Sequence, residues 1–279
     1  MQEDKGAFLV RKNILPERRN LLSGLLLLVK LVFCKIRAKI REIRLCTGKK
    51  GIPRADLADL IRKNADIIEL ITIENLCSRL GININSHEVI IKYPPKLFDK
   101  QPLLMFYSEI TVLSMLAKGM NAKNIFEIGT FEGNTSANIA YNVNDDAAIY
   151  TLDFSLYRLC ANADAAVKYV ESDARARSIV KILEGDSLEF DFSPFYNRMD
   201  IVYIDGGKTY KCVLSDSENA YRCVKNGGLI IWHDFLAFGK YHSVVASVAF
   251  DLCRKYHLKL SLIDGTRMVI AKKNYEDKP

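Results

Sequence analysis

The sequence predicts an α/β fold: a doubly wound, mostly parallel seven-stranded sheet with one antiparallel edge strand, preceded by an α-helical N-terminal extension. From Asn121 onward, short β-rich runs alternate with stretches long enough for a helix, which is typical of parallel strands joined by helical crossovers. Before Asn121 the apolar residues recur at helical spacing. We therefore divide the chain into a basic helical extension (1–54), a helical lead-in segment (55–120) and an α/β domain (121–279).

The composition is that of a folded protein whose positive charge lies near the N-terminus. At 279 residues, with 49% hydrophobic and 26% charged residues, the chain can bury a substantial core. Residues 1–54 contain 14 Lys+Arg and 4 Asp+Glu, whereas the remainder contains 26 and 29. A nucleic-acid enzyme carries positive charge on its catalytic body, so we expect no nucleic-acid partner. The seven cysteines are dispersed and form no C-x-x-C pair, which indicates reduced thiols and a cytoplasmic protein.

The N-terminal extension contains the apolar run "NLLSGLLLLVKLVF", from Asn20 to Phe33. As a helix this run would be about 21 Å long, short of the roughly 30 Å hydrocarbon core of a bilayer. Continued to Leu45, it predicts an amphipathic helix with a basic polar face. Two roles stay open: packing on another helix or a second subunit of a homodimer, and peripheral contact with the inner surface of a membrane. A cleaved signal peptide is not expected, because no small-x-small site follows the run.

The lead-in segment predicts two helices. Gly48, Gly51 and Pro53 mark a linker. Helical apolar spacing then predicts a helix from Ala55 to Leu80, which Gly81 ends. A loop over 93–102 precedes a second helix, from about Leu103 to Lys118.

The α/β domain contains five runs that predict parallel strands: "NIFEIG", "AIYTLD", "IVKILEG", "DIVYID" and "GLIIWHD". A helix from about Tyr241 to Tyr256 follows. The runs "LKLSLID" and "RMVIAKK" then predict two strands joined by a tight turn at Gly265, one of them the antiparallel edge strand.

Polar residues and glycines stand where these strands end. In open parallel sheets, ligands bind outside the carboxyl ends of the strands, where the strand order reverses. The residues at these ends are Glu127, Gly129, Asp153, Gly185, Asp186, Asp205, Gly206, His233 and Asp234. Their number at strand ends indicates a binding site.

The first strand end, "NIFEIGTFEGNTS", carries an acidic residue and two glycines that are four positions apart. This spacing differs from the G-x-G-x-x-G of dinucleotide sites, which disfavours an NAD-dependent oxidoreductase, and there is no G-K-[ST] phosphate loop. A loop that allows close approach, beside a carboxylate that repels phosphate, suits a ligand with an amino group, a ribose and a positive centre. S-adenosylmethionine is such a ligand.

On these residues the sequence resembles the class I methyltransferases, a Rossmann-like family whose first motif reads E-x-G-x-x-x-G. The motif is Glu127, Gly129 and Gly133 here, with Thr130 and Ser136 also in the loop. The resemblance extends over about Met105 to Lys272 and implies further contacts with S-adenosylmethionine. By similarity, Asp153 accepts hydrogen bonds from the ribose hydroxyls, and "EGDS", with Asp186 and Ser187, borders the adenine ring.

The later strand ends narrow the resemblance. "DIVYIDGGKTY" and "KNGGLIIWHDF" are similar to a branch with I-D-G-x-H-x-Y and G-G-x-I-x-x-H-D, and distantly like the cation-dependent catechol and caffeoyl-coenzyme A O-methyltransferases. Lys208 stands where the first branch has His, so Lys208 and His233 are alternative general bases. Asp205 also belongs to the expected cofactor and catalytic sites. Asp205 and Asp234 are candidate carboxylate ligands of Mg²⁺.

The sequence therefore predicts an S-adenosylmethionine-dependent O-methyltransferase of a small molecule or sugar, with Mg²⁺ assistance left open. The alternative is a non-catalytic protein that binds S-adenosylmethionine and uses its N-terminal helix to attach to a membrane or a partner.

Overall fold

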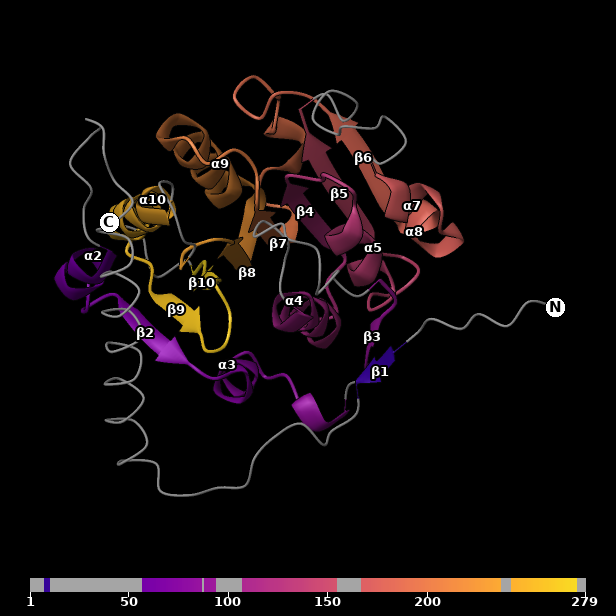
Figure 1. Cartoon of the computed structure of the whole chain (residues 1–279), viewed down its shortest axis with the longest axis horizontal. Helices are drawn as coiled ribbons and strands as arrows, with labels where there is room; N and C mark the ends of the chain where they lie inside the picture. The colour runs from indigo at the N-terminus through magenta and orange to yellow at the C-terminus, as the bar shows by residue number, and fades with distance from the viewer. Residues whose placement is uncertain are drawn as a thin grey trace, which may run out of the picture.

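The computed structural model describes residues 8–10, 57–86, 88–93, 107–154, 167–236 and 242–274. They form three layers, with one large sheet between two layers of helices (Figure 1). The strands are β1 (Phe8–Val10), β2 (Ile68–Ile71), β3 (Val89–Ile91), β4 (Asn124–Ile128), β5 (Ala148–Asp153), β6 (Val180–Glu184), β7 (Met199–Ile204), β8 (Val224–Trp232), β9 (Leu260–Ile263) and β10 (Val269–Lys272). The helices are α2 (Leu57–Lys63), α3 (Ile73–Arg79), α4 (Tyr107–Gly119), α5 (Asn134–Ala140), α7 (Lys168–Glu171), α8 (Ala174–Ile179), α9 (Tyr210–Cys223) and α10 (His242–Lys255), with short 3₁₀ turns at Ile84–Ser86 and Ser193–Phe195.

The large sheet has the order β2-β9-β10-β8-β7-β4-β5-β6. β10 runs antiparallel to both of its neighbours, and the other pairs are parallel. The predicted fold class, a mostly parallel α/β sheet, is confirmed. In detail the sheet has eight strands among the described residues, and β10 lies between β9 and β8 and not at the edge. The reason is that the β9–β10 hairpin folds inward onto β8, while β2 pairs with the outer side of β9.

The prediction of one helix from Ala55 to Leu80 is wrong in its middle. Helix α2 ends at Lys63, after which the Asn64 side-chain amide donates a hydrogen bond to the Leu60 carbonyl (2.8 Å) and the Asn64 backbone carbonyl accepts from Ile67 N (3.0 Å). The β-branched run that follows forms β2, which pairs in parallel with β9. Pairing with a distant strand therefore outweighed the local helical spacing. The predicted N-terminal helix and the linker at 48–53 lie outside the described residues.

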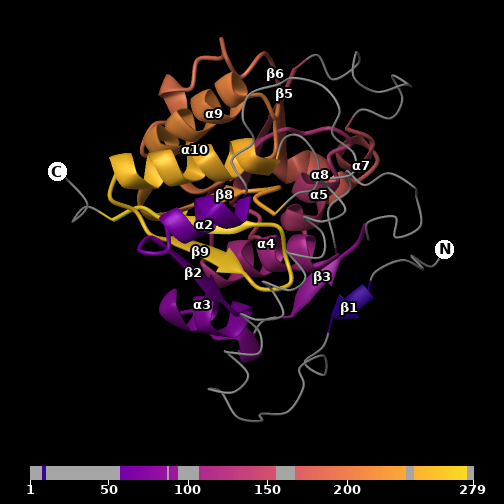
Figure 2. The same ribbon diagram turned by 60° about the vertical axis from the view of Figure 1, so that its left-hand side comes forward.

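The two helical layers cover opposite faces of the sheet (Figures 1 and 2). Helices α2, α9 and α10 pack on one face, and α3, α4, α5 and α8 pack on the other. Successive residues of β7 alternate between the two cores, with Ile201 and Tyr203 in one and Val202 and Ile204 in the other. Because all six residues of β7 are buried, this central strand is apolar along its whole length apart from Asp200.

Strand β3 lies outside the large sheet, where it pairs antiparallel with β1. Two asparagine side chains, Asn138 in α5 and Asn142 just after it, also contact β3. Asn142 Oδ1 accepts from Ile90 N, and its amide donates to Ile90 O, both at 2.8 Å. Asn138 Oδ1 accepts from Lys92 N and Tyr93 N, both at 3.0 Å. The side-chain amides thus bond backbone groups of 90–93 in addition to the pairing of β3 with β1.

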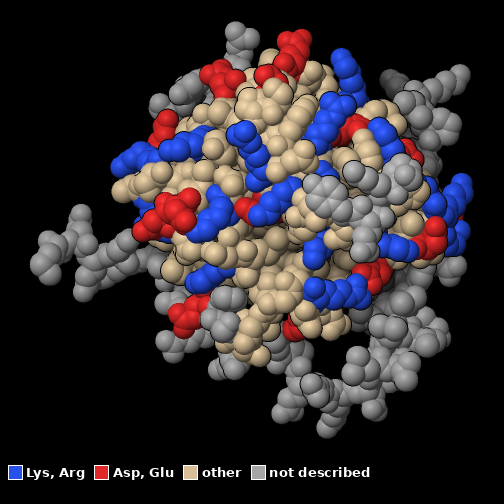
Figure 3. All heavy atoms as spheres, turned by 180° about the vertical axis from the view of Figure 1, so that it is seen from behind, with Lys and Arg blue, Asp and Glu red and all other residues tan. Residues whose placement is uncertain are grey.

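Positive and negative side chains are intermingled on one face of the molecule. On the face opposite to that of Figure 1, Lys and Arg lie among Asp and Glu (Figure 3). This agrees with the near balance of charge counted for residues 55–279. None of the described helices has the length and apolar character that a membrane span requires.

One buried carboxyl lies under the loop that follows β7. Neither oxygen of Asp216, on α9, has a hydrogen-bond partner among the described residues, and the residue is fully buried. A Cβ placed on Gly206 would lie 3.1 Å from Asp216 Oδ2, so a bare backbone covers this carboxyl. Burial raises the pKa of Asp216 to about 6, although the nearby Ser187 and Lys208 offset part of the effect.

We expect Asp216→Asn to stabilise the protein at neutral and alkaline pH. A pKa raised from 3.8 to about 6 means that the wild type loses stability as the pH rises through this interval. The variant should therefore be more stable by about 2–3 kcal/mol at pH 8, and by much less near pH 4. Urea denaturation at several pH values measures the difference. Asp191→Asn, at an exposed loop position, is the control; equal effects of pH on both variants would contradict the prediction.

Candidate active site

The site is built on the point where the strand order reverses. β4 lies between β5 and β7, and the carboxyl ends of these parallel strands meet at one edge of the sheet. Gly129 follows β4 with φ +104°, and a Cβ placed there would lie 2.4 Å from the Asp205 carbonyl oxygen. The backbone of Asp205 and Gly206 occupies the space where a side chain at 129 would lie, so only glycine fits here and the two strand ends are in direct contact.

Glu127 is the buried acid of the first motif. Its Oε2 accepts hydrogen bonds from the hydroxyls of Ser136 and Thr151, the second at 2.7 Å, and the Thr151 hydroxyl also bonds that of Thr130 at 2.7 Å. Burial raises the pKa of Glu127 to about 8, and the carboxylates of Asp205 and Asp153 add to the shift. Ser136 and Thr130 thus belong to the hydrogen-bonded support of this carboxyl.

The next two strand ends lie beside the first. Asp153 Oδ2 accepts from Phe131 N and its Oδ1 from Phe154 N, both at 2.7 Å, which ties the end of β5 to the glycine loop. Gly133 has φ +75° and caps α5. The backbone carbonyl of Asp153 accepts from Gly185 N at 2.9 Å, so the segment with Asp186 and Ser187 follows directly alongside. The predicted cofactor residues are therefore brought to one edge of the sheet.

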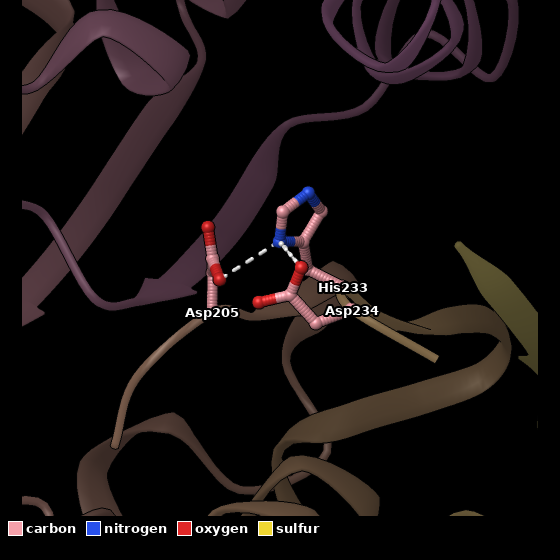
Figure 4. Close-up of side chains that lie close together, drawn as sticks. All are labelled: Asp205, His233 and Asp234. Atoms are coloured by element: carbon pink, nitrogen blue, oxygen red, sulfur yellow. Dashed lines mark hydrogen bonds and ion pairs between the residues drawn. The ribbon is translucent and has the colours of Figure 1, made fainter. Parts of the chain in front are cut away.

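Asp205, His233 and Asp234 converge at the ends of β7 and β8 (Figure 4). His233 Nδ1 lies 3.0 Å from Asp205 Oδ1 and 3.3 Å from Asp234 Oδ1. Lys208 Nζ lies 2.8 Å from Asp205 Oδ1 and 3.4 Å from Asp234 Oδ2. The sequence-predicted catalytic and metal-binding residues therefore form one cluster, with the two carboxylates between the imidazole and the ammonium group.

The cluster stabilises the charged forms of its members. Burial alone would lower the pKa of Lys208, but the carboxylates of Asp205 and Asp234 outweigh it and raise the value. The same holds for His233, whose pKa is raised well above its usual range by Asp205, Asp234 and Glu109. Conversely, the neighbouring cations outweigh burial and lower the pKa of Asp205 and Asp234. Both candidate bases therefore hold their protons firmly in this arrangement.

Two further residues, Glu109 and Arg267, complete the cluster and were not predicted from the sequence. Glu109 on α4 is fully buried, and its Oε2 lies 3.1 Å from His233 Nε2. The Arg267 side chain contacts Glu109 through Nε and NH2, both at 3.0 Å, and Asp234 through NH1 at 3.1 Å. The only signal in the sequence is an acidic residue within the apolar stretch that begins α4.

Asp205, His233 and Asp234 can each offer one ligand atom, and these atoms lie within 4.8 Å of one another. Carboxylate oxygens suit Mg²⁺, and an imidazole suits transition metals better. The donor set therefore fits a divalent cation, provided that the proton on His233 Nδ1 is lost.

Comparisons with known proteins agree with this geometry. Residues 126–235 match the model of a family described as a methyltransferase domain. The chain is 33% identical to tapetum-specific methyltransferase 1 of Arabidopsis thaliana over 140 residues, 47% of this chain and 54% of that protein. It is 32% identical to caffeoyl-CoA O-methyltransferase 2 of Petunia hybrida over 149 residues, 52% and 57% of the two chains.

The chain thus spans about half the length of the curated relatives that it matches. A crystal structure from Corynebacterium glutamicum shares the fold, with a TM-score of 0.50 at 12% identity over 87% of this chain and 97% of that one. The family match and the relatives confirm the resemblance that the motifs predicted: residues 126–235 are similar to a methyltransferase domain.

Proposed function

We propose that this protein transfers the methyl group of S-adenosylmethionine to a hydroxyl oxygen of a small molecule. One observation carries the proposal: a bare glycine backbone at the end of β4 directly adjoins a cluster of acidic and basic side chains at the end of β7. Methyl transfer from a sulfonium needs a cofactor site and a proton acceptor next to each other, and this arrangement offers both.

The cofactor would lie along the edge formed by the first three strand ends. Glu127 would face its amino group, and Asp153 its ribose. The carboxylate oxygens of Asp153 each accept one backbone hydrogen bond and retain lone pairs for two hydroxyls. Asp186 and Ser187 would border the adenine.

Lys208 is the better candidate for the general base. Its side chain is 22% exposed, whereas that of His233 is 1% exposed and has polar partners at both ring nitrogens. The general base must be within reach of the hydroxyl group that accepts the methyl group. His233 is enclosed and does not meet this condition. We assign His233 to the support of Asp205 and Asp234.

We further propose that Asp205, His233 and Asp234 hold a divalent cation such as Mg²⁺. When bound, the cation supplies Lewis-acid activation, which lowers the pKa of an acceptor hydroxyl. Lys208 would receive the hydroxyl proton, because its contacts with Asp205 and Asp234 hold its amine beside these two proposed metal ligands.

The rim of the site favours an acceptor with an apolar or ring-shaped part. Phe131, Phe154 and Tyr210 follow the ends of β4, β5 and β7 closely, and about half of each side chain is exposed. Exposed aromatic rings beside a polar site stack on aromatic or sugar rings. The non-catalytic alternative is less well supported, because a scaffold has no need of a buried acid-base cluster.

We expect Asp153→Ala to weaken the binding of S-adenosylhomocysteine by about 10- to 100-fold, because hydrogen bonds to a charged group contribute roughly 1.5–3 kcal/mol. Isothermal titration calorimetry measures the dissociation constant. Asp191→Ala is the matched control, since Asp191 also accepts a backbone hydrogen bond in a loop. Unchanged affinity in Asp153→Ala, with the protein folded, would remove Asp153 from the cofactor site.

Lys208→Met should lower kcat by about 100-fold or more, the usual contribution of a general base. Because the carboxylates hold the proton on Lys208, wild-type kcat should rise with pH above neutrality, and this rise should be absent in the variant. Turnover of labelled S-adenosylmethionine with a panel of hydroxylated acceptors gives the rates. If Lys208→Met keeps both the rate and the pH dependence, Lys208 is not the base.

If the wild type binds the cofactor without turnover on any acceptor, the scaffold alternative is favoured.

Removal of divalent cations with EDTA should lower the methylation rate, and Mg²⁺ should restore it. In Asp234→Asn, which loses one carboxylate charge, restoration should need a higher Mg²⁺ concentration. Rates are measured against free Mg²⁺ for the wild type and the variant. An EDTA-treated enzyme that is fully active would exclude the cation from the mechanism.

A further inference from the structure

We propose that Glu109 and Arg267 are positioning residues, which together fix the ring of His233 and the carboxylate of Asp234 toward the reacting groups. The inference rests on the proposed function in that the Asp205–His233–Asp234 cluster serves methyl transfer. Neither residue lies at the carboxyl end of a parallel strand. Glu109 comes from α4, which precedes β4, and Arg267 comes from the hairpin between β9 and β10.

Glu109 holds the side of the His233 ring that faces away from Asp205. Its Oε2 lies 3.1 Å from Nε2, while Nδ1 faces Asp205 and Asp234 at 3.0 and 3.3 Å. With a carboxylate at each end of the imidazole, the ring plane cannot turn without the loss of a hydrogen bond. His233 is buried, so water cannot replace a lost partner.

Arg267 holds Glu109 and Asp234 at the same time. Its backbone N–H and its Nε donate to Glu109 Oε1 at 2.9 and 3.0 Å, and NH2 donates to Oε2 at 3.0 Å. NH1 reaches Asp234 Oδ1 at 3.1 Å. The planar guanidinium therefore sets the distance between the two carboxylates, which a lysine ammonium cannot do in the same way.

Asp234 needs such a partner because its backbone is strained. Its φ is +60°, in the left-handed region that aspartate enters at some cost. The carbonyl oxygen of Arg267 accepts from Phe235 N at 2.8 Å, directly after this turn. Arg267 thus contacts the turn through its backbone and its side chain, and both contacts direct Asp234 toward Lys208.

A purely stabilising role does not account for this arrangement. Buried ion pairs contribute little net stability compared with apolar side chains of similar volume. Two apolar residues would fill the same space but would leave the His233 ring and the Asp234 turn without directional contacts. In addition, Ser108 Oγ donates to the Gly265 carbonyl at 3.0 Å, so the start of α4 and the hairpin remain attached without the ion pair.

The test uses the whole 279-residue chain with Glu109→Gln, which keeps shape and removes charge, and Arg267→Lys, which keeps charge and removes the planar contact. Arg79→Met is the control, because Arg79 pairs with Glu69 on the exposed surface. Circular dichroism establishes folding. If Arg267→Lys does not fold, Glu109→Gln alone decides the outcome.

The first readout requires no activity. In protein labelled at His and Tyr, nuclear Overhauser contacts between the rings of His233 and Tyr203, whose centroids are 6.0 Å apart, report the ring orientation. We expect these contacts to weaken or change in both variants and to persist in Arg79→Met. Calorimetry with S-adenosylhomocysteine should give dissociation constants within about twofold of the wild type, because neither residue is placed in the cofactor site.

The second readout is the rate. We expect kcat to fall by at least about tenfold in both variants while KM for S-adenosylmethionine stays nearly constant. Folded variants with unchanged ring contacts and wild-type kcat would overturn the inference. If the wild type itself shows no methyl transfer, the proposed function fails, yet the ring contacts still test the positioning role separately.

Discussion

The close approach of two strand ends is the constraint on which the site depends. Gly129 after β4 and Asp205 after β7 lie so close that a Cβ at 129 would overlap the Asp205 carbonyl. This contact exists because β4 starts the central αβ unit and later strands return to either side of it. It places the glycine loop after β4 next to the Asp205 carboxylate. The proposed cofactor loop and the charged cluster are therefore neighbours as a result of the topology.

The charged cluster contains equal numbers of acidic and basic groups, which explains how it can be buried. Three carboxylates, Glu109, Asp205 and Asp234, face three basic groups, Lys208, His233 and Arg267. With all six ionised, the cluster carries no net charge and can remain inside the protein. A cation in the proposed metal site would disturb this balance, and the basic groups nearest to it would be the ones to lose protons. The same residues can thus support an idle state and a reacting state.

The sequence predicted the parallel core well because the short β-rich runs are separated by helical stretches and end in glycine or acidic residues. The grouping of Asp205, Lys208, His233 and Asp234 could also be predicted, since Asp205 and His233 directly follow strands and the other two lie within the next few residues. Prediction failed where a partner distant in the chain decides the structure. Strand β2 forms because β9 offers an open edge, and Glu109 and Arg267 meet only after the hairpin folds onto β8. No local sequence pattern predicts contacts between residues that are so far apart in the chain.

The left-handed backbone at Asp234 limits how this position can vary during evolution. Glycine, asparagine and aspartate adopt such a conformation at the lowest cost. Glycine would remove the side-chain oxygen that faces Lys208 and Arg267, and most other residues would distort the turn after β8. Asparagine alone would keep both the left-handed backbone conformation and a side-chain oxygen that faces Lys208 and Arg267. In functional descendants of this chain, position 234 should therefore be either aspartate or asparagine, whereas neighbouring surface positions can vary more widely.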